Sequence, residues 1–168
     1  MDLLKLTMAL LLAPVFSCTA GTNVVTDFVD AELSGQIDGQ DWVYKHAYID
    51  PTIRTPNEDD IVFIFLPYVP TEKCPRSPGD SKDQRSVMVA APQQIKLVPI
   101  KAGTHRNLVF QYEDKNGVQI AKSAKKGKLK LLTMGQDKVV GKLYGRFSDS
   151  NWVSGNFSAT VCNSLDLR

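Results

Sequence analysis

Histidine and the sequence motifs of common enzymes are scarce in this chain. It has 168 residues but only two histidines, His46 and His105, which lie far apart in the sequence. No GxSxG, HExxH, P-loop or dinucleotide-binding fingerprint occurs, and no CxxC pair offers zinc ligands. We therefore predict a protein that is not an enzyme and has neither a metal site nor a cofactor. A hydrolase that combines one histidine with distant Ser and Asp residues is an alternative.

The net charge of this sequence is small, and its apolar runs are short. The formal charge is +2, and removal of residues 1–17 takes away one Lys and one Asp, which argues against a nucleic-acid partner. A membrane-spanning helix needs about 20 apolar residues, whereas the run from Leu6 to Phe16 has about a dozen. That length, preceded by Lys5 and broken by Pro14, is typical of a secretory signal peptide. We predict export, with residues 1–17 as the signal peptide.

The end of this leader carries a recognisable pattern. The segment Val15-Phe16-Ser17-Cys18 resembles the lipobox of bacterial lipoproteins, in which an aliphatic residue lies three before a cysteine and a small residue just before it. The resemblance implies that Cys18 is acylated, becomes the mature N-terminus and anchors the chain in a membrane. Thr19 after the cysteine implies the outer membrane in that family. The alternative is cleavage after Ala20, which would leave a secreted or soluble periplasmic protein.

The cysteine count fits this expectation. Three cysteines are present, so a lipid on Cys18 leaves Cys74 and Cys162 as a pair in an oxidising compartment. A bridge between them would close a loop of almost ninety residues and stabilise the fold by about 4–5 kcal/mol. Two unpaired thiols too far apart to bridge are the alternative.

Short β-forming segments follow one another through the mature chain. The pairs 31–37 with 42–49 and 108–113 with 118–122 flank Asp38-Gly39 and Asn116-Gly117, which are typical of type I′ hairpin turns. The run IVFIFL at 61–66 predicts a strand buried on both faces. A C-terminal meander is expected from 129–134, 139–147 and 152–161, with core candidates at Val139, Leu143, Phe147, Val153, Phe157 and Val161.

These segments predict an all-β fold, an antiparallel β-sandwich or alternatively a small β-barrel. We assign residues 18–30 to the lipidated N-terminus and a tether, because they lack a clear period, and residues 31–168 to a single β domain. Glycines 141, 145 and 155 inside the last strands indicate bulges, bends or close backbone approach.

Candidate binding residues lie in a long loop and in a basic run. The loop 67–85 is rich in proline and offers Tyr68 as an aromatic contact, or it is a surface loop tied by the disulfide. The basic run could attract phosphorylated lipid headgroups or an acidic polymer, or it is a solvated hairpin edge within an ordinary half-buried strand. Its members are Lys122, Lys125, Lys126, Lys128 and Lys130.

Two further patterns are weaker. The acidic group 57–60 could bind calcium, although solvated loop residues are the more common explanation. Trp42, Tyr44 and Tyr48 alternate and could form a sugar-stacking platform, or they pack in the core.

Taken together, these patterns predict a non-enzymatic, membrane-anchored envelope lipoprotein. Its disulfide-stapled β domain would bind an unknown protein or envelope polymer, with Cys18 in the membrane. The alternative is a lipocalin-like carrier of a small apolar ligand, which an internal cavity would favour.

Overall fold

Eleven β-strands make up the regular structure of the computed structural model, which describes residues 25–50, 53, 60–75, 84–92, 97–101 and 108–162, the segment 97–101 by its backbone alone. The leader, Cys18, His105 and Asn57 to Asp59 lie outside these residues. The strands are β1 (Ser34–Ile37), β2 (Gln40–Val43), β3 (His46–Asp50), β4 (Asp60–Leu66), β5 (Ser86–Pro92), β6 (Leu97–Lys101), β7 (Leu108–Glu113), β8 (Gln119–Ser123), β9 (Lys126–Met134), β10 (Lys138–Ser148) and β11 (Asn151–Val161).

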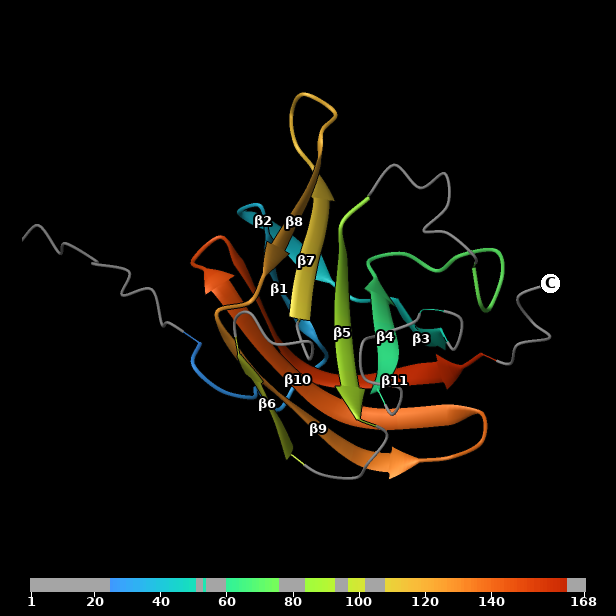
Figure 1. The fold of residues 1–168 in the computed structure, drawn as a ribbon. Helices are drawn as coiled ribbons and strands as arrows, with labels where there is room; N and C mark the ends of the chain where they lie inside the picture. Colours follow the sequence, from blue (N-terminus) through green and yellow to red (C-terminus); the bar gives the residue numbers. More distant parts are fainter. Residues whose placement is uncertain are drawn as a thin grey trace, which may run out of the picture.

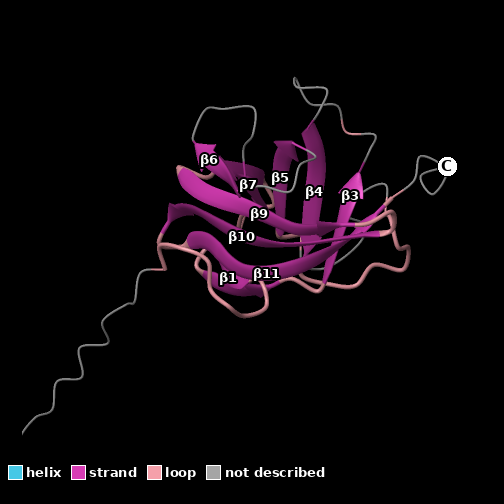
Figure 2. Cartoon of the chain, turned by 90° about the horizontal axis from the view of Figure 1, so that it is seen from below, coloured by secondary structure: helices cyan, strands magenta, loops and turns pink. Residues whose placement is uncertain are grey.

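All eleven strands belong to one hydrogen-bonded sheet that curls into a half-barrel (Figure 1). The main order is β6-β9-β10-β11-β3-β4-β5-β7-β8, with the β1–β2 hairpin attached to β11. In Figure 2, β9, β10 and β11 run across the view while β3, β4 and β5 run steeply to them. The all-β prediction is confirmed. One pair departs from the antiparallel pattern, because β11 runs parallel to β3 at Thr160 and Val161.

The first predicted hairpin is present, but the strand after it is shorter than expected. Asp38 and Gly39 both have positive φ, 55° and 72°, and β1 pairs with β2 around them. The predicted strand 42–49 is divided into β2 and β3. The reason is that the backbone changes partners: the Tyr44 amide donates to the Leu33 carbonyl, and the Lys45 amide donates to the Leu66 carbonyl.

The second predicted hairpin, β7–β8, is also present, with a different turn. Only Gly117 has positive φ in it, at 78°, so the type I′ assignment at Asn116-Gly117 is wrong. The Gly117 amide donates to the Asp114 carbonyl, and the Asp114 carboxylate accepts from the amides of Asn116 and Val118. This local capping by an Asp side chain explains the turn, and it lowers the pKa of Asp114, chiefly through the hydrogen bond from Val118.

The predicted C-terminal meander is confirmed as β9, β10 and β11. Its core candidates are either buried or packed partly buried against the core. A register shift opposite Val140 and Gly141 marks a bulge at Leu132 in β9. Gly155 has φ of 144°, and a Cβ there would lie 2.7 Å from the carbonyl oxygen of Glu32. The glycine therefore lets the chain before β1 approach β11 closely.

The core lies on both faces of β4, as predicted for the run 61–66. Phe63 and Phe65 face the inside of the half-barrel, where both rings meet Phe157 at centroid distances of 5.7 and 5.0 Å. The alternate β4 residues face outward and form a smaller buried cluster beneath the loop 67–75. This outer cluster consists of Tyr48, Val62, Ile64, Leu66, Cys74 and Cys162.

Candidate binding surfaces

A disulfide joins Cys74 to Cys162, with a Cα–Cα distance of 5.9 Å across a sequence separation of 88 residues. It ties the loop 67–75 to the end of β11, and each cysteine is only 3% exposed. The ring Nε2 of His46 lies 2.9 Å from the carbonyl oxygen of Lys73, which is a second tie to this loop. The predicted pairing is confirmed.

The aromatic residues of the loop and of β2–β3 are packed into the domain. Tyr68 is half-buried against the outer cluster, so only part of its ring is accessible to a partner. Trp42 and Tyr48 are each 1% exposed. Trp42 and Tyr44 pack in the inner core, whereas Tyr48 belongs to the outer cluster. The sugar-platform interpretation is therefore wrong and the core interpretation is correct. Burial raises the pKa of Tyr48 to about 12.

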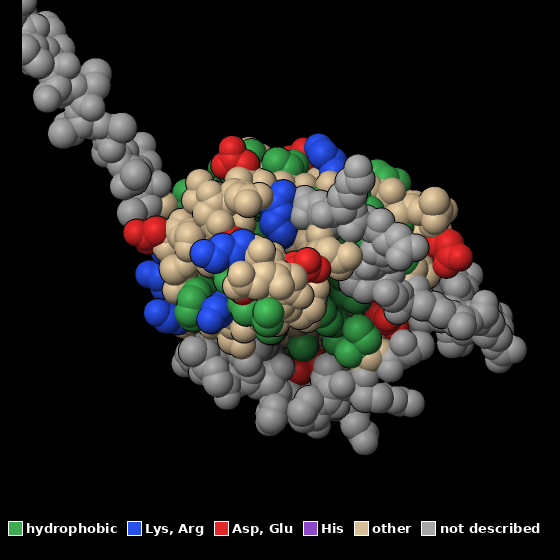
Figure 3. Space-filling model, turned by 90° about the horizontal axis from the view of Figure 1, so that it is seen from above, with side chains coloured by type: hydrophobic (Ala, Val, Ile, Leu, Met, Phe, Trp, Pro, Cys, Tyr) green, Lys and Arg blue, Asp and Glu red, His purple; other side chains and the backbone are tan. Residues whose placement is uncertain are grey.

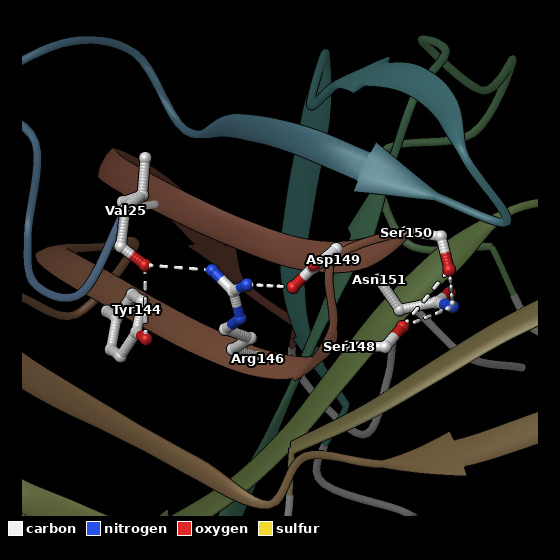
Figure 4. A network of polar contacts seen from close by, with 7 residues as sticks. All are labelled: Val25, Tyr144, Arg146, Ser148, Asp149, Ser150 and Asn151. Carbon is white, nitrogen blue, oxygen red and sulfur yellow. Dashed lines mark hydrogen bonds and ion pairs between the residues drawn. The ribbon is translucent and has the colours of Figure 1, made fainter. Parts of the chain in front are cut away.

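Residues 25–30 form an N-terminal strap across the outer face of β9, β10 and β11. The Val29 amide donates to the Ser154 hydroxyl at 2.8 Å, and that hydroxyl donates to the Asp27 carbonyl at 2.8 Å. The Val25 carbonyl accepts hydrogen bonds from Tyr144 and Arg146, each at 3.3 Å (Figure 4). This part of the segment assigned to a tether is thus held against the domain.

Two ion pairs complete the docking of the strap. Lys128 lies 2.8 Å from Asp27, and Lys142 lies 3.0 Å from Asp30, which also accepts from the Asn156 amide group. The hydrogen bond from Lys128 is the main cause that lowers the pKa of Asp27. The pKa of Asp30 is lowered first by Asn156 and then by Lys142. These groups are solvent-exposed, so the pairs fix the position of the strap more than they stabilise the fold.

The strap lies on a surface that we call the basic face. It consists of the outward-pointing cations of β9 and β10, namely Lys126, Lys128, Lys130, Lys142 and Arg146. The sheet register places Lys126 opposite Arg146 and Lys130 opposite Lys142, whereas Leu129 and Leu131 point into the core. Like charges directly opposite each other on a sheet are destabilising. Figure 3 shows Lys and Arg side chains at several places on the face seen from above, most of them toward the left of the view.

The lysines of the predicted basic run therefore lie in two different places. Lys126 and Lys128 belong to the basic face, while the ammonium groups of Lys125 and Lys122 lie 4.7 and 5.9 Å from the ring centre of Phe147. The hairpin-edge interpretation is wrong for β9, because β6 pairs with it. The expectation of an ordinary half-buried strand is confirmed by the alternation of Lys and buried Leu.

An open pocket of about 560 Å³ lies beside the β9–β10 turn. Its wall is largely apolar and includes Ile49, Ile61, Met134, Val139 and Val161, with Gln136 at the turn. These side chains belong to or pack against the inner core, so the pocket continues the inner surface of the half-barrel. The sequence did not indicate this pocket: Val139 and Val161 were expected only as core residues, and the pocket walls come from strands distant in the chain.

The described ranges contain no group of three His, Cys, Asp or Glu residues arranged to hold a metal ion. Asp60, the described member of the acidic group, is buried at the start of β4. Across the same ranges, no helix is long and apolar enough to span a membrane. No family model, curated protein or solved structure matches this chain.

Proposed function

We propose that this protein is a non-enzymatic envelope lipoprotein, anchored in the outer membrane through an acylated Cys18 and displaying its β domain to a binding partner. The number and the pairing of the cysteines are the observation that supports this proposal. Of three cysteines, Cys74 and Cys162 are joined to each other, and Cys18 is the remaining thiol at the end of the lipobox-like segment. A buried structural disulfide also fits an oxidising compartment outside the cytoplasm.

The mechanism in this proposal is display at a surface. An anchor confines the domain to a thin layer next to the membrane and so raises its effective concentration near envelope targets. The disulfide holds the loop 67–75 on the domain, so a contact made by this loop would need little further ordering. The partner in this proposal is a protein or an envelope polymer.

The mass of the membrane-fractionated protein tests the anchor. We expect a mature chain that begins at Cys18 and carries the added mass of a diacylglycerol and of fatty acyl groups. The Cys18→Ala variant should lose this mass and leave the membrane fraction, while retaining the Cys74–Cys162 disulfide. A soluble wild-type product beginning near Gly21 would contradict the proposal.

The open pocket supports a second candidate function, a carrier of a small apolar ligand. A volume of about 560 Å³ is within the range of small-molecule sites. Titration with a fluorescent fatty acid should give saturable binding that Met134→Glu weakens at least about ten-fold, because it places a charge in the pocket wall. Leu132→Glu is the matched control, since Leu132 is 40% exposed and is not part of that wall. Equal binding by both variants would exclude the pocket as the site.

A further inference from the structure

The strap neutralises only part of the basic face. Asp27 and Asp30 pair with Lys128 and Lys142, and Arg146 pairs with Asp149. Lys126 and Lys130 are exposed, and neither has an ion-pair partner within the described ranges. Each is opposite another cation in the register, so positive potential remains concentrated on this surface.

The same surface is where the chain leaves the domain toward Cys18. Val25 is held by Tyr144 and Arg146, whose register partners on β9 are Lys128 and Lys126. Val25 follows Cys18 by seven positions, with six residues between them. Whatever conformation these residues adopt, seven Cα–Cα steps span at most about 25 Å. An anchor on Cys18 would therefore keep Val25, and with it the basic face, within about 25 Å of the bilayer surface.

Charge complementarity indicates what this surface would meet. Lysine and arginine near an anionic leaflet are attracted over roughly a Debye length, about 8 Å at physiological salt. A single lipid anchor commonly works together with a basic patch in membrane binding. The exposed lysines of the basic face lie close to the one point of the domain that the anchor would hold near the headgroups.

We propose that the basic face on β9 and β10 is a membrane-contact surface, which rests on anionic phospholipid headgroups when the chain is anchored at Cys18. This inference rests on the proposed lipid anchor. It adds an orientation: the outer face of β9 and β10 is turned toward the bilayer, and the loop 67–75 remains available to a partner in the aqueous compartment.

A tethering experiment tests the orientation without depending on natural acylation. The oxidised mature chain is coupled through its Cys18 thiol to a maleimide phospholipid in phosphatidylcholine vesicles, with and without phosphatidylglycerol. Lysine acetylation is then followed by mass spectrometry. We expect Lys126 and Lys130 to react several-fold more slowly on the anionic vesicles, and high salt to abolish the difference. Lys45 and Lys115, which are exposed elsewhere on the domain, should react equally on both.

Charge-neutralising variants give an independent measurement. In the Cys18→Ser background, Lys126→Gln combined with Lys130→Gln should lower partitioning onto phosphatidylglycerol vesicles about 30-fold, since each lysine near such a surface contributes roughly five-fold. The control, Lys45→Gln with Lys115→Gln, makes the same change in net charge at exposed positions away from β9 and β10 and should change partitioning much less.

Several outcomes would overturn the proposal. Equal acetylation of Lys126 and Lys130 on both vesicles would do so, as would preferential protection of Lys45 and Lys115. Protection on neutral vesicles only after addition of an acidic polysaccharide would assign the face to a polymer. If the tethered chain shows the expected protection but the native protein carries no acyl mass, the contact surface stands and the lipoprotein proposal fails.

Discussion

Loss of the Cys74–Cys162 bridge should destabilise the domain strongly. In the chain-entropy description, a cross-link lowers the entropy of the unfolded chain in proportion to the logarithm of the loop that it closes. A sequence separation of 88 residues gives about 4–5 kcal/mol at 25 °C. A typical domain has a total free energy of unfolding of 5–15 kcal/mol, so the bridge would account for a large share of it.

Reduction of the disulfide and replacement of both cysteines should destabilise the domain by different amounts, because only replacement removes the packed sulfur atoms. Both cysteines are 3% exposed in the outer cluster, where they pack with side chains such as Tyr48 and Leu66. Protein refolded in reductant keeps the sulfur atoms and loses only the link. The Cys74→Ala, Cys162→Ala double variant also loses buried volume, so we expect it to be less stable than the reduced wild type by about 1 kcal/mol.

Equilibrium urea unfolding measures both effects. With an m-value near 2 kcal/mol/M, loss of the link should lower the unfolding midpoint by about 2 M urea. The Cys18→Ser variant is the matched control, because it removes a cysteine without breaking the bridge, and its midpoint should not change. A change of less than about 1 kcal/mol on reduction would refute the entropic reasoning for this loop.

Three further predictions concern the strap and the core. Gly155→Ala should destabilise the domain by about 2 kcal/mol or more in urea unfolding, because its φ of 144° is strained for alanine and the new Cβ would meet backbone atoms; an unchanged midpoint would contradict this. The pKa values of Asp27 and Asp30 are lowered in the folded chain, so docking of the strap should be stable above about pH 4 and be lost as the pH falls through these folded-state pKa values. NMR titration of the strap amides checks this. Asp27→Asn should remove part of the pH dependence. The pKa of Tyr48 is about 12 in the folded chain and about 10 in the unfolded chain. The free energy of unfolding should therefore fall by about 2–3 kcal/mol between pH 10 and 12. The Tyr48→Phe variant should not show this fall.

Local features of this fold could be predicted because neighbouring residues determine them. Asp38-Gly39 predicts its own turn, since both residues tolerate positive φ, and the apolar run 61–66 predicts a strand with two buried faces. The spacing of four between Val139 and Leu143 did not fix a register, but four is an even number, and both side chains point into the core. The pairing of Cys74 with Cys162 followed from the number of cysteines and from the oxidising compartment that the leader predicts.

Features that depend on distant partners could not be predicted in this way. The break after β2 arises because the Tyr44 amide bonds to Leu33, just before β1, whereas the Lys45 amide bonds to Leu66 of β4, and no local pattern indicates such a change of partner. The strap, expected to be part of a tether, is held by contacts separated by more than 100 residues, such as Val29 with Ser154. The residues of the strap have no hydrophobic period, and the face on which they dock is formed by β9, β10 and β11. No local pattern therefore indicates that they dock.

The position of β11 links the two ends of the molecule. It is the last of the described strands, yet it pairs with β10, β1 and β3, and its residues Ser154 and Asn156 hold the strap. The hairpin β1–β2 and the strap therefore cannot dock before the C-terminal residues are available, and Cys162 follows β11 directly. Such non-local pairing slows folding, because loop closure must precede the contacts that reward it. Formation of the disulfide would then fix β11 against the loop 67–75 after the sheet has assembled, an order that is compatible with the proposed export of the chain to an oxidising compartment.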